Sequence, residues 1–208
     1  HQNQFKEKEF VCIILYSNHC KISQSFEGLI KEISEHLDSE NSILIVISPN
    51  NENALLPNEL AYSDVGDSLK EMRIRSKDRN FEFPYLYDGV KQSVSNQLSA
   101  KSTPHAFLFN KTRNLVYSGR IGDYNDPNNL EKSDLYQTYR RARNHTHINQ
   151  VVTKVHGTAI KTKEDIFIAN EVRRRYSEES VKIRPINQQT LKFFLKYNLR
   201  KTTLFYLW

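Results

Sequence analysis

Two apolar runs enclose an amphipathic segment near the start of the chain, and they constrain its fold more than any other feature. Residues 10–16 and 43–47 are almost wholly apolar, and apolar side chains recur every three to four residues over 22–37. Such runs are typical of strands buried on both faces, and the spacing between them is typical of one face of a helix. Strand, helix and strand in this order predict a parallel pair joined by a right-handed crossover. The chain therefore begins as an α/β fold.

Weaker patterns continue this alternation along the chain. We expect a helix over residues 64–77, an extended segment over 81–88 and a short helix over 90–98. The apolar stretches 106–109 and 115–118 are separated by a polar turn, which predicts a β-hairpin. Further helices are expected from a Ser133 cap to about residue 143, over 164–176 and over 189–198.

The composition is that of a globular protein with a basic surface. The net charge is +6, and the excess lies mostly in two short arginine runs, residues 140–143 and 173–175. No aromatic residues of the kind that stack on RNA bases accompany these runs, so we interpret them as solvated helix faces and expect no nucleic-acid partner. No apolar stretch predicts a membrane span.

The tetrapeptide Ser17-Asn18-His19-Cys20 lies between the first apolar strand and the helix that follows it. A C-x-x-C at this kind of junction is typical of a dithiol redox site, but here Ser17 stands at the first position. A serine hydroxyl cannot exchange with a disulfide, because the reaction needs a thiolate. The other cysteine, Cys12, falls inside the apolar strand and is expected to be a buried, inert thiol that forms no disulfide with Cys20.

Three further segments carry a family resemblance. Residues 83–88 read Phe-Pro-Tyr-Leu-Tyr-Asp, Thr103-Pro104 precedes the hairpin, and residues 115–121 read Leu-Val-Tyr-Ser-Gly-Arg-Ile. Together with Ser17–Cys20, where bacterial members have C-N-H-C, they resemble the thioredoxin fold. More closely, they resemble the redoxin family that includes the alkyl hydroperoxide reductase and thiol-specific antioxidant proteins. The resemblance implies a thioredoxin-like central mixed sheet flanked by helices, in a bacterial protein of the periplasm or cell envelope.

The resemblance also implies roles for five residues. Ser17 stands where the attacking cysteine would be, and Cys20 stands at the resolving position. His19 either tunes the thiol or is an inherited solvent-facing residue. Thr103-Pro104 is expected to have a cis peptide bond, which places a backbone edge beside Cys20 where a polypeptide or thiol partner pairs. No cofactor is implied.

Three functions remain open at this point. The first is a thiol-disulfide or antioxidant protein that is weakly active or inactive, because Ser17 replaces the attacking thiol. The second is a non-catalytic module that binds polypeptides through the Thr103-Pro104 groove. The third is a one-Cys peroxidase, because Ser17 and Cys20 imitate the T-x-x-C motif of peroxiredoxins. We expect slow reaction of Cys20 with peroxide, since a helix start alone stabilises a thiolate only modestly.

The likeness suggests three regions. Residues 8–143 are expected to form the redoxin domain, and residues 144–186 a helical or irregular extension. Residues 187–208 resemble the run-up to a thioredoxin active site, so they are expected to begin a second domain whose C-x-x-C would follow Trp208. The chain starts at His1, and we expect that an export signal has been removed. His145, His147 and His156 lack accompanying carboxylates or cysteines, so no metal site is predicted.

Overall fold

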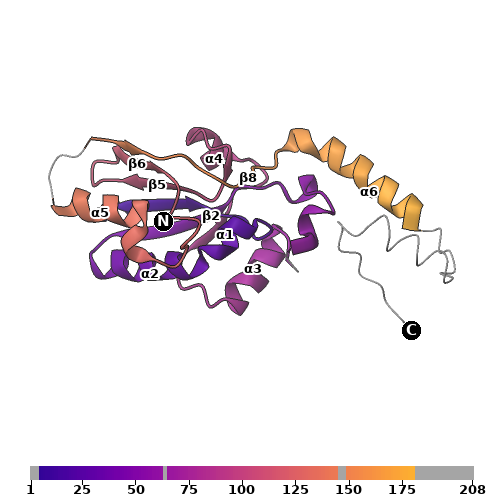
Figure 1. The fold of residues 1–208 in the computed structure, drawn as a ribbon. Helices are drawn as coiled ribbons and strands as arrows, with labels where there is room; N and C mark the ends of the chain where they lie inside the picture. The colour runs from indigo at the N-terminus through magenta and orange to yellow at the C-terminus, as the bar shows by residue number, and fades with distance from the viewer. Residues whose placement is uncertain (1–4, 63–64, 145–148, 181–208) are drawn as a thin grey trace. The chain divides into compact units, whose positions relative to one another are not determined.

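The computed structural model describes residues 5–62, 65–144 and 149–180 (Figure 1). The chain divides into two compact units, residues 1–172 and 173–208. The first unit is built on a six-stranded sheet in the order β3-β2-β1-β5-β6-β7. Its strands are β1 (Val11–Leu15), β2 (Ile43–Ser48), β3 (Tyr85–Tyr87), β5 (His105–Phe109), β6 (Leu115–Gly119) and β7 (Val151–Val152). A second, two-stranded sheet pairs β4 (Ser102–Thr103) with β8 (Thr158–Ala159).

Helices α1 to α5 belong to the first unit, and α6 begins in the first unit and ends in the second. Their bounds are α1 Lys21–Ser25, α2 Glu27–Ser39, α3 Leu69–Asp78, α4 Ser93–Gln97, α5 Asp134–Asn144 and α6 Ile166–Ser180. Short 3-10 turns occur at Glu52–Ala54, Glu59–Tyr62, Leu130–Lys132 and Lys163–Asp165. Within the part of the chain that the structure describes, no helix is both long enough and apolar enough to cross a membrane.

Strand β1 lies in the middle of the large sheet. It pairs parallel with β2, as the two apolar runs predict, and antiparallel with β5. β5 and β6 form the predicted hairpin, with an irregularity between Leu108 and Phe109. The predicted mixed sheet with three core strands is therefore confirmed.

Alternate side chains over residues 11–16, which comprise β1 and Tyr16 directly after it, enter two different cores. Cys12, Ile14 and Tyr16 pack in the cluster that contains residues of α2 and α5, whereas Val11 and Leu15 pack in a second cluster with residues of α4. Figure 1 shows α2 and α5 on one side of the sheet and α4 on the other. Burying each large apolar side chain contributes about 1.5–3 kcal/mol, so a central strand buried on both faces fixes the register of the sheet.

Two helices differ from the sequence prediction. The segment expected as one helix from residue 22 is broken at Phe26, whose backbone has φ −92° and ψ 2° and whose ring is buried in the core. The helix expected from residue 64 begins only at Leu69, because Ser68 and Glu71 form a capping box there. The residue before this cap, Asp67, is buried and takes part in the site described below.

Two short strands lie in the segment that the sequence assigns to an extension. β7 pairs parallel with β6, and β8 pairs antiparallel with β4. Both pairings join residues 151–159 to the sheet-bearing unit. The predicted boundary near residue 143 and the predicted start of a second domain at 187 stay predictions, and residues 187–208 lie outside the described part of the chain.

Candidate functional site

The loop Ser17–Cys20 follows the carboxyl end of β1 and is buried at all four residues. Cys20 caps the N-terminus of α1, because its Sγ accepts a hydrogen bond of 3.4 Å from the backbone N–H of Ser23. The thiol in turn donates to the backbone carbonyl of Thr103 at 3.3 Å. Cys20 is therefore an enclosed thiol with a polar partner on each side.

Thr103 connects the two ends of the motif. Its Oγ1 shares a hydrogen bond of 2.8 Å with Ser17 Oγ, while its carbonyl accepts from Cys20. The Thr103-Pro104 peptide bond is cis, as predicted. The structure thus brings Ser17, Cys20 and Thr103-Pro104 together, and the hydroxyl that replaces the attacking thiol is bonded to the residue before the proline.

His19 is buried, so the solvent-facing alternative is wrong. Its Nδ1 lies 2.7 Å from Oδ2 of Asp67, which is also buried. Its other ring nitrogen, Nε2, is enclosed and has no hydrogen-bond partner among the described residues. Because the ring is tied to Asp67 on one side, His19 holds the loop in place through the carboxylate.

Asp67 is a site residue that the sequence analysis missed. Besides His19, its carboxylate accepts hydrogen bonds from the backbone N–H of Asn18 at 2.6 Å and from Nδ2 of Asn50 at 2.7 Å. Asn50 Oδ1 then accepts from the backbone N–H of Lys161 at 2.8 Å. One buried carboxylate therefore connects the Ser17–Cys20 loop, the segment after β2 and the segment after β8.

The backbone edge before Pro104 is already paired. β8 lies antiparallel to β4, with Thr103 opposite Thr158, and the hydroxyl oxygens of these two threonines are 3.4 Å apart. A Cβ atom at Gly157 would lie 1.9 Å from the carbonyl oxygen of Thr103, so the chain approaches this oxygen more closely than a residue with a side chain allows. The edge expected to meet a partner is thus covered by residues of the same chain.

A hollow of about 380 Å³ adjoins Pro104. It is bounded by α1 and the residue that follows it, by the turn after β6 and by His156. Its lining residues are Ile22, Phe26, Pro104, Arg120, Ile121, Gly122, Asp123, Tyr124, Asn125 and His156. Tyr124 is about half exposed, at 49%. An aromatic ring and a proline beside an open hollow are suited to contacts with a polypeptide.

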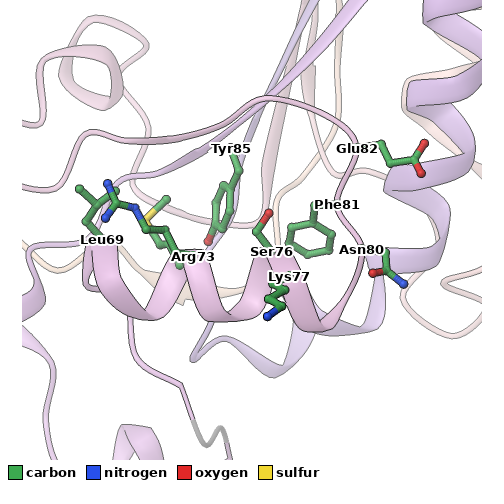
Figure 2. A pocket seen from close by; sticks show the side chains of 9 residues that line it. Leu69, Arg73, Ser76, Lys77, Asn80, Phe81, Glu82 and Tyr85 are labelled. Atoms are coloured by element: carbon green, nitrogen blue, oxygen red, sulfur yellow. The ribbon is translucent and has the colours of Figure 1, made fainter.

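A larger hollow of about 790 Å³ lies along α3. Figure 2 shows Arg73, Ser76 and Lys77 on this helix, with the rings of Tyr85 and Phe81 beside them. The hydroxyl of Tyr85 donates to Oδ1 of Asn18 at 2.9 Å, and burial raises the pKa of Tyr85, so this hydroxyl stays protonated. Tyr85 therefore connects this hollow to the Ser17–Cys20 loop.

The remaining predicted features take no part in the hydrogen bonds around Ser17–Cys20. Cys12 is buried in β1, as predicted, and burial raises the pKa of its thiol. His156 is exposed, whereas His145 and His147 lie outside the described residues, and the described part of the chain contains no group of three metal-ligating side chains. Arg140 and Arg143 lie on the exposed surface of α5, where they pair with Glu131 and Glu40.

Comparisons with known proteins identify a shared fold. No protein-family model and no curated protein matches the chain. A hypothetical protein from Sinorhizobium meliloti 1021 is 24% identical to this chain and has a TM-score of 0.61; the match covers 78% of this chain and 84% of that protein. An uncharacterized conserved protein from Geobacillus kaustophilus is 22% identical, covers 76% and 80%, and has a TM-score of 0.60. A putative thioredoxin from Neisseria meningitidis is 15% identical, covers 68% and 77%, and has a TM-score of 0.48.

The architecture itself agrees with the sequence resemblance. A four-residue motif follows the central strand and opens a helix, and Thr103, which precedes a cis proline just before β5, accepts a hydrogen bond from that motif. The neighbouring strands are parallel on one side and antiparallel on the other. The chain has an α/β thioredoxin-like fold.

Proposed function

We propose that the chain is a redoxin-type protein, of the alkyl hydroperoxide reductase and thiol-specific antioxidant class, whose site now binds polypeptide instead of catalysing thiol-disulfide exchange. The observation that carries the proposal is how Ser17 and Cys20, the first and last residues of the motif, are bonded and buried. Ser17 Oγ is bonded to Thr103 Oγ1, and the Cys20 thiol is enclosed and bonded to the Thr103 carbonyl. Because exchange needs an accessible thiolate, neither end is suited to attack a disulfide.

The hollow beside Pro104 supports the binding part of the proposal. It combines a proline, an aromatic ring and apolar side chains with two charged residues, Arg120 and Asp123. Apolar contacts with a few polar groups at the margin are typical of polypeptide-binding grooves. We therefore place the partner segment along Pro104 and Tyr124.

Redox activity is tested with the insulin disulfide-reduction assay. The natural chain is expected to show no turnover, and Ser17→Cys is expected to gain measurable exchange, because the substitution restores the missing sulfur at the attacking position. Cys20→Ser in the Ser17→Cys background is the control, since it removes the resolving thiol. Robust turnover by the natural chain would show that Cys20 alone suffices and would refute the loss of exchange.

Polypeptide binding is tested with reduced, carboxymethylated α-lactalbumin, an unfolded chain without free thiols. Tyr124→Ser should weaken binding about tenfold, because truncating an aromatic side chain at an interface commonly costs more than about 1 kcal/mol. Phe167→Ser is the matched control, since Phe167 is an exposed aromatic residue on α6 that does not line the hollow. Equal binding by both variants would place the partner elsewhere.

The one-Cys peroxidase is a second candidate, because the Ser23 N–H bond to Cys20 Sγ is of the kind that stabilises a thiolate. The Cys20 thiol, however, donates a hydrogen bond to the carbonyl of Thr103 and is buried. We expect slow consumption of hydrogen peroxide by the Cys12→Ala chain. Rapid formation of sulfenic acid at Cys20, measured by mass spectrometry, would make the peroxidase the leading function.

A further inference from the structure

Residues 157–161, here called the strap, contain β8 and end just before the helical turn Lys163–Asp165. β8 contributes two residue pairs with β4, and Ile160 N–H adds a hydrogen bond of 3.0 Å to the carbonyl of Lys101. The side chain of Ile160 packs against the core cluster that contains Val11 and Leu15. The strap is therefore held by backbone pairing and by one apolar anchor.

The far end of the strap has a polar anchor at Lys161. Its backbone N–H donates to Asn50 Oδ1 at 2.8 Å, and its carbonyl accepts from Asn51 N–H at 2.9 Å and from Gln92 Nε2 at 2.9 Å. Asn50 also bonds Asp67, which holds His19. The strap is thus connected to the Ser17–Cys20 loop by side chains as well as by its place over Thr103.

The near end of the strap lies against the group that the thiol uses. The carbonyl of Thr103 accepts from Cys20 Sγ, and Gly157 packs so closely on this carbonyl that a Cβ atom would lie 1.9 Å from its oxygen. Thr158 places its hydroxyl 3.4 Å from the hydroxyl of Thr103, which is bonded to Ser17. Cys20, Ser17 and Thr103 are all fully buried, and the strap contacts Thr103, to which both other residues are hydrogen-bonded.

The pairing of β4 with β8 is short, so it can open without disrupting the six-stranded sheet. β4 and β8 form a sheet of their own and share no strand with the six-stranded sheet. Gly157 and Ala159 are exposed, so the near end of the strap has few buried contacts besides those of Ile160. The far end stays fixed by the hydrogen bonds of Lys161 and by its ion pair with Glu59. Segments with few buried contacts open locally at much lower free energy than the whole domain.

We propose that the strap is an internal occupant of the β4 edge, and that its release controls access of an extended polypeptide to Thr103 and of reagents to Cys20. The proposal rests on the proposed function where it concerns the polypeptide partner. In the closed state the strap pairs with β4 as an added strand. In the open state β4 offers its backbone N–H and C=O groups to a partner segment with a small residue opposite the Thr103 carbonyl.

The first test measures alkylation of Cys20 by iodoacetamide, followed by mass spectrometry, in a Cys12→Ala background. Gly157→Val should raise the labelling rate about tenfold or more, because the added side chain cannot fit on the Thr103 carbonyl and a tenfold change in opening takes only about 1.4 kcal/mol. Lys154→Val is the matched control, since Lys154 is exposed and lies outside the strap. Equal rates in the two variants would overturn the proposal.

The second test closes the strap reversibly, so it does not depend on how Gly157→Val folds. Ser102 and Ala159 are directly paired across β4 and β8, and paired residues on antiparallel strands lie within the span of a disulfide. The double substitution Ser102→Cys and Ala159→Cys, once oxidised, should slow Cys20 labelling about tenfold relative to its reduced form. Unchanged labelling on oxidation would overturn the proposal.

A peptide with the sequence of residues 155–162, labelled with fluorescein, separates the strap from the proposed function. It should bind the Gly157→Val chain and the reduced double variant more tightly than the oxidised one. Binding that is equally tight to the oxidised form would overturn control by the strap while leaving polypeptide binding in place. Faster Cys20 labelling without peptide binding would support the gate and refute the partner edge.

Discussion

Replacing Asp67 by Asn is expected to lower the free energy of unfolding substantially, although the two side chains have nearly the same shape. Asp67 is fully buried, and its two carboxylate oxygens accept three hydrogen bonds. Oδ1 accepts from Asn18 N–H, whereas Oδ2 takes both His19 Nδ1 and Asn50 Nδ2. An asparagine has the same shape but offers only one acceptor oxygen and carries no charge.

The magnitude follows from counting donors. In either orientation of the new amide, its NH2 group faces at least one buried donor that loses its acceptor, which costs about 1–3 kcal/mol. The bonds that remain lose their charge assistance, and such bonds are roughly twice as strong as neutral ones. We therefore expect Asp67→Asn to lower the free energy of unfolding by about 2–4 kcal/mol.

Urea unfolding followed by circular dichroism measures this effect. With a slope of about 2 kcal/mol per molar urea, the midpoint should fall by about 1–2 M. Asp78→Asn is the control, because Asp78 lies on the exposed surface of α3 and should change the free energy by less than about 0.5 kcal/mol. If Asp67→Asn costs no more than Asp78→Asn, the carboxylate does not organise the site as described.

Three further outcomes are expected. Arg75 donates to the buried carboxylate of Glu27 at 2.9 and 2.6 Å, so Arg75→Leu should lower the free energy of unfolding in urea by about 3–5 kcal/mol. Adding Glu27→Gln should recover part of this loss, because it removes the unpaired buried charge, and no recovery would contradict the pairing. Burial lowers the pKa of His105 to about 4, below its value of about 6.5 in the unfolded chain, so the neutral ring stabilises the folded state at neutral pH. This contribution, about 1–2 kcal/mol after allowing for the partly exposed ring, should be lost as the pH falls from about 6.5 to 4, and His105→Gln should remove that part of the pH dependence of unfolding. Because burial raises the pKa of the Cys12 thiol, iodoacetamide at pH 8 should label Cys12 only in the urea-unfolded chain, and labelling in the native chain would refute its enclosure.

The apolar runs predicted the centre of the fold because both faces of these strands are covered. β1 and β2 must be apolar at consecutive positions, so their pattern is visible without any knowledge of their neighbours. The cis Thr103-Pro104 bond was predicted from the family resemblance alone. The helix break at Phe26 was not predicted, because the apolar spacing continues through it.

The polar part of the site could not be predicted in the same way. Asp67 and Asn50 lie in loops rich in polar residues, where nothing in their local sequence distinguishes a buried carboxylate or amide from an exposed one. Their roles depend on contacts over long separations, such as the 48 positions between His19 and Asp67. β7 and β8 are two residues long each, which is too short for a periodic pattern, so the strap was also missed.

The margins of the six-stranded sheet bear on how the folded unit avoids aggregation. Among the residues that the structure describes, the sheet ends on one side in β3, with three residues, and on the other in β7, with two. Long flat edge strands recruit strands from other molecules, whereas very short ones offer too few backbone groups to do so. Although Leu86 and Val152 expose apolar side chains at these margins, we expect little edge-to-edge association of the six-stranded sheet when the molecules are crowded together in solution.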